Sequence, residues 1–457
     1  METHHHKRSA FSGKLGFVLS AAGASVGLGN IWRFPYLAAK YGGGIFLLIY
    51  IVLAVTFGYT MIMAETALGR MTKKSPVGAF AAFGKGGGFA FGGWINAIIP
   101  ILIVPYYSVI GGWVIKYLVE YLRGGGSALA QDGYFSEFIS SGVSVELCFV
   151  VFTLLTLGII YAGVRNGVER VSKCMMPVLA VLSVIIAVYS VTRPGALAGV
   201  KYFLVPNLDN FSWMTVVSAM GQMFYSLSIA MGILITFGSY MKKDVSIEGS
   251  TTNVEIFDTA IAIMAGLMII PAVFAFSGGD PDTLQAGPAL MFITIPKVFD
   301  SMGMGTVVGV MFFLLVLFAA VTSSIALTES AVSTFEDELG WKRHKSTLLI
   351  GVIMLALGSL SALGYGPLAG VTVFGMQFLD LFDFLTNSVM MPIAAIATCL
   401  LVSRVVGVDK IEEEVTQNGG QFRRKAVFNF MIRYLCPLFA AIILVSSVAN
   451  ALGWIKM

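Results

Sequence analysis

The sequence predicts an all-helical membrane protein that crosses the bilayer eleven times. Hydrophobic residues make up 57% of the 457 residues and charged residues only 12%, whereas soluble domains carry about 25% charged residues. The apolar residues are gathered into long segments of about 20 residues or more, the length that a helix needs to cross the hydrocarbon core. Lys and Arg are unevenly distributed between the connecting segments. These observations exclude a soluble enzyme and a disordered scaffold, and they make the lipid bilayer the main surroundings of the chain.

Eleven segments meet this length and composition. The predicted spans cover residues 13–38, 43–70, 88–122, 143–163, 167–191, 214–240, 254–278, 304–336, 345–364, 371–403 and 428–453. When the N-terminal tail is placed in the cytoplasm, twenty-one of the 29 Lys and Arg residues lie on the cytoplasmic side and seven on the other. This asymmetry is typical of membrane proteins. We therefore expect a multi-pass protein of the cell membrane with a cytoplasmic N-terminus and an extracytoplasmic C-terminus.

The first and the sixth spans are interrupted by small and polar residues. Residues 23–30 read Gly-Ala-Ser-Val-Gly-Leu-Gly-Asn, and residues 226–232 read Ser-Leu-Ser-Ile-Ala-Met-Gly. Backbone that leaves the helix at membrane depth is tolerated only where it is buried in protein or lines a cavity. Broken spans at corresponding positions predict two inverted repeats of five helices with one additional helix. Close helix packing is the alternative for Gly23 and Gly27, which have the GxxxG spacing.

This interpretation divides the chain into five parts. They are a cytoplasmic N-terminal tail at 1–12, a first repeat of five spans at 13–191, a second repeat at 192–403, a cytoplasmic loop at 404–427 and an eleventh span at 428–457.

Motifs of other protein classes are missing from the sequence. The four cysteines form no CxxC pair, and His344 has no histidine partner, so a zinc site or a disulfide framework is not expected. No Gly-Lys-Ser/Thr phosphate loop and no nucleophile–base set are present, which argues against an enzyme. The net charge of +4 is too small to indicate nucleic acid as a partner.

The run over residues 23–35, Gly-Ala-Ser-Val-Gly-Leu-Gly-Asn-Ile-Trp-Arg-Phe-Pro, resembles the first helix of the neurotransmitter:sodium symporter family. Further motifs of that family follow along nearly the whole chain: Gly42-Gly43-Gly44, Glu65 ahead of Gly69-Arg70, Tyr106-Tyr107 ahead of Trp113, Gly221-Gln222, Thr322-Ser323-Ser324 and Glu336-Asp337-Glu338. The chain is most similar to the small bacterial amino-acid transporters of that family, related to the leucine transporter. The resemblance implies a sodium-coupled symporter that works by alternating access, with two sodium sites.

The resemblance places a zwitterionic amino acid at mid-membrane, between the two broken helices. The substrate carboxylate would meet the free N–H groups of Leu28 and Gly29 at the positive end of a half-helix. The hydroxyl of Tyr107 would add a donor, although an ordinary interfacial tyrosine is the alternative. The substrate amine would face the carbonyl ends of the inner half-helices and the region of Ser226 and Ser228, both of which are expected to contact the substrate.

The first sodium site implied by the resemblance takes the side chains of Asn30, Ser226 and Asp258 and the backbone carbonyl of Ser25. These ligands are all oxygens, which hard cations prefer. The substrate carboxylate would complete the site, so sodium and substrate would each bind better when the other is present.

The second implied sodium site takes the carbonyls of Gly23, Val26 and Ala319 and the hydroxyls of Thr322 and Ser323. It would tie the first helix to the eighth. Because it has no charged ligand, we expect it to bind sodium more weakly and to release it readily to the inside. The alternative is that the hydroxyls bond back to their own helix.

Asp258 is the most informative departure from the family pattern. The animal members carry Asn at this position with a Ser four residues on, and they need chloride nearby, whereas this chain has Asp258 and Ala262. A carboxylate supplies the negative charge that chloride would bring, so we expect chloride-independent transport. The alternative is that Asp258 caps the start of the seventh helix.

The resemblance also implies two gates. Arg33 needs a partner because an unpaired charge inside a span is costly, and Asp383 matches the acid of the outer gate. At the inner end, Arg8 would pair with Asp337, with Tyr240 nearby. Such weak pairs suit a gate that must open.

The N-terminal tail and the fifth helix carry two further features. Phe11 replaces the Trp that family members usually have in the N-terminal latch. Gly167 and Pro177 would let the fifth helix unwind, with a simple packing kink as the alternative.

The walls of the implied pocket decide the class of substrate. They include the uncharged residues Ile103, Tyr225, Met231, Ser324 and Leu327. A charged substrate side chain would meet no partner there, and Met is flexible. We therefore expect large hydrophobic amino acids, aromatic or branched, as substrates.

Three further expectations do not depend on the pocket. The transporter is expected to be a monomer. Glu65 is expected to be a buried structural acid near the break in the first helix, and Glu329 has no assigned role.

Three alternatives to a symporter remain at this stage. The first is a transport-inactive amino-acid sensor or a trafficking partner that keeps the fold, against which the intact sodium ligands argue. The second is a channel, against which the two implied gates argue. An enzyme is the weakest alternative.

Overall fold

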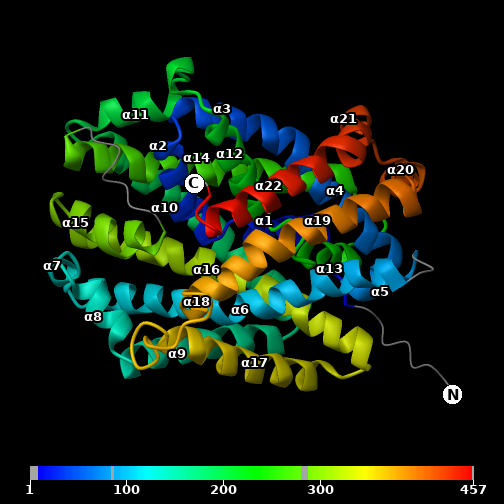
Figure 1. Ribbon diagram of the computed structural model, residues 1–457, viewed down its shortest axis with the longest axis horizontal. Helices are drawn as coiled ribbons and strands as arrows, with labels where there is room; N and C mark the ends of the chain where they lie inside the picture. Colours follow the sequence, from blue (N-terminus) through cyan, green and yellow to red (C-terminus); the bar gives the residue numbers. More distant parts are fainter. Residues whose placement is uncertain (1–8, 84–86, 279–286, 455–457) are drawn as a thin grey trace.

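The computed structural model describes residues 9–83, 87–278 and 287–454. Within these ranges the chain is helical, and its only strand-like pairing is an isolated bridge between Val373 and Met376. The long helices run roughly side by side (Figure 1). Short helices such as α7 and α11 lie at one end of the bundle, while α5 and α20 lie at the other end.

Among the described residues up to 204, the chain forms eleven α-helices. They are α1 (Lys14–Ser25), α2 (Phe34–Lys40), α3 (Gly44–Leu53), α4 (Tyr59–Thr72), α5 (Pro76–Ala81), α6 (Gly87–Leu122), α7 (Gly126–Leu129), α8 (Tyr134–Ser140), α9 (Val143–Tyr161), α10 (Arg170–Val191) and α11 (Ala196–Leu204). Three π-helical turns lie among them: η1 (Gly29–Arg33), η2 (Ala54–Gly58) and η3 (Val164–Glu169).

The second part contains the remaining helices. They are α12 (Trp213–Ser226), α13 (Ile233–Tyr240), α14 (Ile247–Ser277), α15 (Ile295–Asp300), α16 (Gly305–Leu339), α17 (Arg343–Leu363), α18 (Phe378–Asp383), α19 (Met391–Leu400), α20 (Val408–Thr416), α21 (Lys425–Phe430) and α22 (Cys436–Ala451). The π-helical turns here are η6 (Leu290–Thr294), η7 (Phe384–Met390), η8 (Leu401–Val406) and η10 (Met431–Leu435).

Each of the eleven predicted spans overlaps a helix or a broken pair of helices. In the described part of the chain, nine helices are long and apolar enough to cross a membrane, and the bent pair Lys14–Ser25 and Gly29–Lys40 makes a tenth. The predicted sixth span consists of α12 and α13, with 14 and 8 residues, separated by residues 227–232. Neither piece alone spans the hydrocarbon core. The structure therefore shows a multi-pass helical protein, while the count of eleven stays a prediction.

The break in the first span is present where the sequence predicted it. The helix α1 ends at Ser25, and the chain resumes as η1 at Gly29 with a bend of 54°. Close packing is also present here, because a β-carbon at Gly23 would lie only 3.0 Å from Cβ of Thr322. Both interpretations of this glycine motif therefore hold.

The break between α12 and α13 has an unusual backbone. Ser228 and Ala230 adopt positive φ angles of 52° and 60° although neither is glycine, and Gly232 follows with 70°. Left-handed backbone is costly for residues with a β-carbon. The N–H of Ala230 donates to Oε1 of the buried Glu65 over 2.7 Å. Glu65 is thus a buried structural acid as expected, but it supports the break in the sixth span and not the one in the first.

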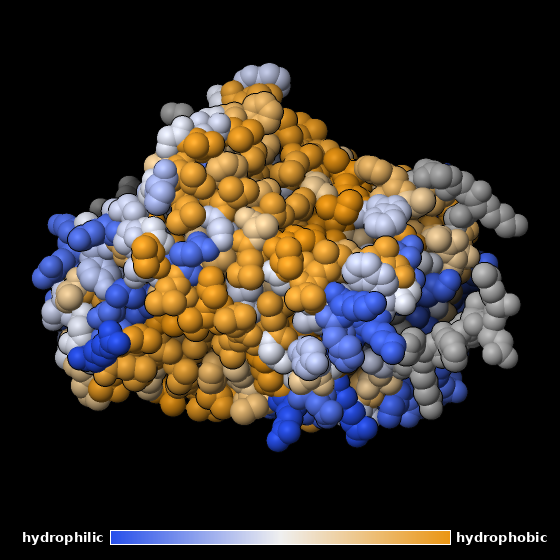
Figure 2. All heavy atoms as spheres, turned by 90° about the horizontal axis from the view of Figure 1, so that it is seen from below, coloured by the Kyte–Doolittle hydropathy of each residue, from blue (hydrophilic) through white to orange (hydrophobic). Residues whose placement is uncertain are grey.

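The surface matches a protein surrounded by lipid. Figure 2 shows a broad hydrophobic band between two hydrophilic margins. The helix α6 is central, because 78% of its most apolar stretch is buried. The continuous span Lys425–Ala451, which comprises α21, η10 and α22, is peripheral, because only 28% of its most apolar stretch is buried. Helices in the interior pack very closely. At Gly69 of α4, for example, a β-carbon would lie 1.9 Å from the carbonyl oxygen of Ile235 in α13, so only glycine allows this contact.

Two segments near the end of the chain differ from the sequence prediction. The tenth span was predicted to begin at 371, but its helix begins at Phe378. Residues 371–377 instead form a turn, in which Phe374 and Gly375 have positive φ angles of 52° and 76°. The predicted cytoplasmic loop at 404–427 contains a helix, α20, whose apolar residues Val408, Ile411 and Val415 are buried. With 9 residues, this helix is too short to cross a membrane, so the length of apolar segments did not predict it.

Candidate functional site

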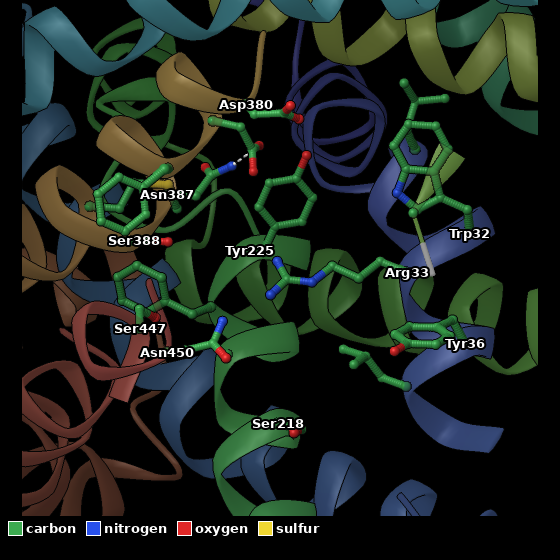
Figure 3. Close-up of a pocket in the computed structure, with 18 of the residues that line it drawn as sticks. Trp32, Arg33, Tyr36, Ser218, Tyr225, Asp380, Asn387, Ser388, Ser447 and Asn450 are labelled. Atoms are coloured by element: carbon green, nitrogen blue, oxygen red, sulfur yellow. Dashed lines mark hydrogen bonds between the residues drawn. The ribbon is translucent and has the colours of Figure 1, made fainter. Parts of the chain in front are cut away.

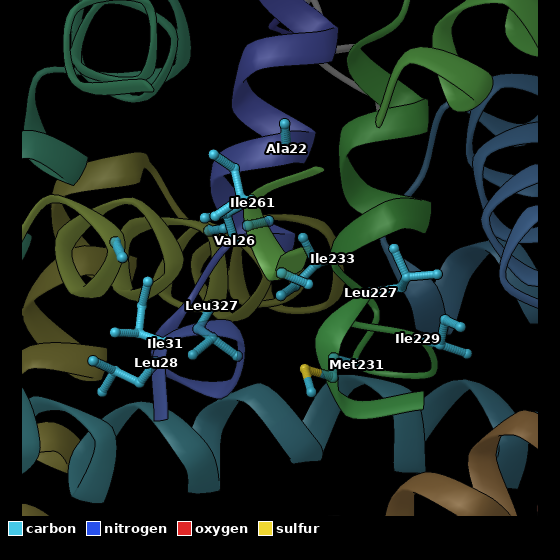
Figure 4. Close-up of a cluster of buried hydrophobic side chains, with 14 of the residues drawn as sticks. Ala22, Val26, Leu28, Ile31, Leu227, Ile229, Met231, Ile233, Ile261 and Leu327 are labelled. Carbon is cyan, nitrogen blue, oxygen red and sulfur yellow. The ribbon is translucent and has the colours of Figure 1, made fainter. Parts of the chain in front are cut away.

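The two breaks enclose a small cavity in the middle of the molecule. Its volume is about 30 Å³. Figure 4 shows buried hydrophobic side chains from both breaks, of which Leu28 and Met231 line the cavity together with Leu327 of α16. The residues that line it are Ala24, Ser25, Gly27, Leu28, Gly29, Asn30, Ile103, Tyr107, Tyr225, Ser226, Ser228, Met231, Ser323 and Leu327. Nine of the ten substrate residues predicted from the sequence are in this set. The tenth, Ser324, lies within 3.1 Å of the hydroxyl of Thr156 instead.

One side of the cavity is polar because the backbone comes close to it. The N–H of Leu28 donates to the hydroxyl of Tyr107 over 3.3 Å, and the hydroxyl of Ser228 donates to the carbonyl of Ala24 over 2.9 Å. Glycine is required beside these groups: a β-carbon at Gly27 would lie 2.7 Å from Oγ of Ser323. A β-carbon at Gly29 would lie 2.5 Å from the ring of Tyr225.

The other side of the cavity is apolar. Ile103, Met231 and Leu327 are each at most 4% exposed, and the ring of Tyr225 completes this side. No charged side chain is among the described residues that line the cavity. A charged group placed here would lose its hydration without gaining a partner.

The predicted ligands of the first sodium site lie together beside the cavity. Asn30 donates through Nδ2 to Oδ1 of Asp258 over 2.9 Å, and the hydroxyl of Ser226 donates to the same carboxylate at 3.0 Å. The hydroxyl of Tyr50 lies 3.4 Å from Oδ2 of Asp258. Asn30, Tyr50 and Asp258 are fully buried, and Ser25 lines the adjoining cavity. This donor set contains one carboxylate, one amide and hydroxyls, which suits a monovalent hard cation.

The alternative role of Asp258 as a helix cap is wrong. The helix α14 begins at Ile247, and its cap is Ser246, whose hydroxyl accepts from the N–H of Gly249 over 3.2 Å. Asp258 therefore lies well inside the helix, where no free N–H groups await a cap. The sequence prediction missed this start because Ile247 is followed by the run Glu-Gly-Ser-Thr-Thr-Asn, which is not apolar.

The predicted second sodium site joins α1 to α16. The hydroxyl of Ser323 lies 3.1 Å from the carbonyl of Gly23 and 3.5 Å from that of Val26. The hydroxyl of Thr322 donates to its own helix, 2.9 Å from the carbonyl of Phe318 and 3.2 Å from that of Ala319. Backbone bonding, the alternative weighed from the sequence, thus describes Thr322 but not Ser323.

A larger vestibule of about 500 Å³ lies on the side of α2 and α18. Arg33 reaches across it towards Tyr225, with its guanidinium 5.2 Å from the ring centre (Figure 3). Asp383 accepts from Nδ2 of Asn387 over 2.6 Å and from the hydroxyl of Tyr106 over 3.2 Å. The two predicted outer-gate residues both line the vestibule, and among the described side chains they form no ion pair with each other within 4 Å.

Arg8, the predicted partner of Asp337 in the inner gate, lies outside the described residues. Asp337 accepts from the N–H of Ser75 over 2.6 Å. The hydroxyl of Tyr240 donates to Oε1 of Glu329 over 2.7 Å, and its ring packs edge-on against Phe11.

Glu329 is a buried residue whose partners the sequence analysis missed. Nη1 of Arg343 donates to its Oε1 over 3.1 Å, and Nη2 donates to its Oε2. Glu329 is fully buried and Arg343 is 16% exposed. The signal was available, because a carboxylate at membrane depth needs a cation and Arg343 begins the next helix. Tyr240 is thereby connected to both residues.

Comparisons with known proteins place this site in context. The model of the sodium:neurotransmitter symporter family matches residues 8–125 and 135–454. An uncharacterized sodium-dependent transporter of Bacillus subtilis is 34% identical over 441 residues, covering 95% of this chain and 96% of the relative. An uncharacterized sodium-dependent transporter of Haemophilus influenzae is 30% identical, covering 98% and 100%. The crystal structure of MhsT in complex with L-phenylalanine superposes with a TM-score of 0.86 at 34% identity, covering 96% of this chain and 100% of MhsT.

Proposed function

Because this chain belongs to the sodium:neurotransmitter symporter family, we propose that it is a sodium-coupled symporter of neutral hydrophobic amino acids, aromatic and branched. The observation that carries this proposal is the uncharged cavity between the two chain breaks, next to the buried Asn30–Asp258 and Ser323–Gly23 contacts. Family membership supports sodium coupling and membrane transport. Beyond what family membership supports, we propose the substrate class, the two sodium sites and the chloride independence.

The substrate carboxylate would be held by the backbone N–H groups of Leu28 and Gly29 and by the hydroxyl of Tyr107. Tyr107 already accepts from Leu28, so it would turn its own proton towards the carboxylate. The amine would face the carbonyl of Ala24, which Ser228 contacts. The side chain would lie against Ile103, Met231 and Leu327, and MhsT with its bound L-phenylalanine supports this choice of substrate class.

The first sodium ion would bind between Asn30, Ser226, Asp258 and the carbonyl of Ser25. The buried carboxylate of Asp258 would neutralise the ion, so chloride is not needed. The second ion would lie between Ser323 and Thr322 of α16 and the carbonyls of Gly23, Val26 and Ala319. Since the first ion shares the substrate carboxylate, each would raise the affinity for the other.

In alternating access, the cavity would open first to one side of the membrane and then to the other. The open vestibule, where Arg33 and Asp383 are apart, supports an outward-facing conformation in which Arg33 and Asp383 close later. The contacts of Tyr240 and Asp337, with Arg8, would keep the inner side closed. We further propose eleven spans in two inverted repeats at 13–191 and 192–403, a cytoplasmic N-terminus and a monomeric transporter.

The test is uptake and counterflow in proteoliposomes that contain the purified full chain. All twenty amino acids are screened with sodium or potassium outside, each in chloride and in gluconate. We expect sodium-dependent exchange of leucine, phenylalanine and similar residues that is equal in both anions. Sodium-independent exchange, or exchange of charged amino acids alone, would overturn the proposal. A folded protein that binds these amino acids with sodium but does not exchange them would instead be a sensor.

A further inference from the structure

In the segment ahead of α1, Ser12 makes four hydrogen bonds to other parts of the chain, next to Phe11, whose N–H donates to the carbonyl of Tyr240 over 3.1 Å. The N–H of Ser12 donates to Oε2 of Glu169 over 2.9 Å, and its hydroxyl donates to Oε1 of the same carboxylate. Nζ of Lys173 donates to the Ser12 hydroxyl over 2.9 Å. Nζ of Lys242 donates to the Ser12 carbonyl over 2.9 Å. Ser12 thus joins η3 and α10 to the loop that follows α13.

Glu169 is placed for this contact by the packing around it. It is 2% exposed and ends η3, and Lys173 lies one turn further on, with Nζ 2.6 Å from Oε1. A β-carbon at Gly16 would lie 2.5 Å from the carboxylate. The absence of a side chain at this position of α1 is therefore what lets the carboxylate reach the N-terminal segment.

The inner end of the fifth span has weak internal support. Gly163 has a φ of 93°, η3 is a π-helix, and Pro177 lies inside α10. A π-helix is an uncommon local arrangement, and a proline inside a helix removes a hydrogen bond. A β-carbon at Gly167 would lie 2.0 Å from the carbonyl of Ile159, so only glycine fits here. External contacts such as that of Glu169 therefore matter more for the position of this segment than they would for a regular helix.

The same helix touches the proposed second sodium site. Met176 is fully buried, and a β-carbon at Gly23 would lie 3.3 Å from its sulfur. Glu169 and Met176 are seven residues apart, about 10 Å along a helix. The contact with Ser12 and the contact with Gly23 thus hold α1 against one short stretch of the fifth span.

We propose that Glu169 is a positioning residue of the inner gate, whose carboxylate couples the N-terminal segment to the inner end of α10, so that the inner path beside the second sodium site opens only when Ser12 leaves it. The inference rests on the proposed function, because it assumes that sodium at Gly23 and Ser323 holds α1 in place. Sodium release would loosen α1 at Gly23, and the loss of the Ser12 contact would then free the weakly supported segment between Gly163 and Pro177.

The test measures access to Ser172, which is buried and lies between Glu169 and Met176 on α10. The reporter is Ser172→Cys in the full chain, after the four native cysteines have been replaced. Labelling by a membrane-impermeant maleimide is followed from the cytoplasmic side of inside-out vesicles, in sodium or potassium. In the reporter background we expect sodium to slow labelling at least fivefold. Glu169→Ala should label at least fivefold faster in sodium and lose most of its sodium response.

Three further variants make the result specific. Ser12→Ala should give an intermediate rate, and Ser12→Ala combined with Glu169→Ala should label no faster than Glu169→Ala alone. Glu412→Ala is the control, because Glu412 pairs with Lys425 on the cytoplasmic side of the chain, away from α1. It should behave as the background does. If Glu169→Ala does not fold, Ser12→Ala carries the test, since it removes a hydroxyl and leaves the helix intact.

The outcomes separate the inference from the proposed function. If sodium slows labelling in the background and Glu169→Ala or Ser12→Ala responds to sodium just as the background does, the coupling role of Glu169 is wrong. If sodium has no effect in the background, the proposed second sodium site fails first. A lower melting temperature of Glu169→Ala with an unchanged sodium response would show a purely structural carboxylate and would also overturn the inference.

Discussion

Asn30 and Asp258 are joined by a 2.9 Å hydrogen bond between Nδ2 and Oδ1, and both side chains are fully buried. One belongs to the broken first span and the other to the middle of α14. A buried carboxylate is stable as an ion only when it is compensated. The amide and the hydroxyl of Ser226 supply hydrogen bonds but no charge, so a cation bound here would compensate the carboxylate.

The first prediction concerns the charge of Asp258. Asp258→Asn should raise the sodium concentration for half-maximal uptake at least tenfold, because the proposed first site loses its only anionic protein ligand. Asp258→Asn with Ala262→Ser should regain activity only in chloride, since Ala262 is buried one turn further along α14. The measurement is uptake in chloride against gluconate.

Asp209→Asn, a change in the exposed segment before α12, is the matched control and should show no anion response. If the folded double variant is active without chloride, substitution of chloride by the carboxylate is the wrong explanation for Asp258.

The second prediction concerns the closeness of Gly29 to Tyr225. Gly29→Ala should weaken substrate binding at least tenfold, because the new β-carbon would lie 2.5 Å from the ring and such overpacking costs about 1–3 kcal/mol. Gly29→Ala with Tyr225→Ala should recover part of this affinity. Binding of labelled substrate to detergent-purified protein checks it, and equal affinities of Gly29→Ala and the unchanged chain would contradict the geometry.

The third prediction concerns substrate choice. Met231→Phe should lower kcat/KM for phenylalanine at least fivefold relative to leucine, because a rigid ring replaces a flexible side chain in a small cavity. Met311→Phe changes a half-buried residue of α16 outside the cavity lining, so it is the control and should leave the ratio unchanged. An unchanged ratio in Met231→Phe would remove this residue from the proposed substrate wall.

The fourth prediction concerns stability at the end of the bundle where α20 lies. Nε of Arg70 and Oε1 of Glu414 are 2.6 Å apart, with side chains 1% and 4% exposed. Glu414→Ala should destabilise the protein by about 3–5 kcal/mol, since it leaves a buried guanidinium without its carboxylate. Glu412→Ala breaks a half-exposed pair and should cost about 0–1 kcal/mol. Thermal unfolding in detergent compares the two, and similar shifts would contradict the role of burial.

The sequence was sufficient for the parts of the fold that depend on composition and local pattern. Long apolar segments locate the helices, and the glycine-rich run at 23–30 predicted the bend of the first span. Nine of the ten substrate residues that the family resemblance implied also line one cavity. Such features are local, or they follow from a motif whose spacing is specific.

Relationships across the fold could not be predicted from the sequence. The partner of Glu65 is the backbone N–H of Ala230, and a backbone donor leaves no mark in a sequence. Ser324 turns towards Thr156 because α16 packs on α9, and the rotation of a helix that is polar on several sides is decided by its neighbours. The start of α14 was misplaced because polar residues continue the helix outside the apolar window.

The left-handed residues Ser228 and Ala230 have a consequence for biogenesis. Their backbone is unfavourable by about 1–2 kcal/mol each, and Glu65 stabilises it only after α4 has packed against the segment. On its own, the stretch from α12 to α13 therefore favours one continuous helix. Membrane insertion would begin with an intact sixth helix, and the break would appear during assembly of the bundle. A Glu65 variant would then fail late, as an inserted but misassembled protein.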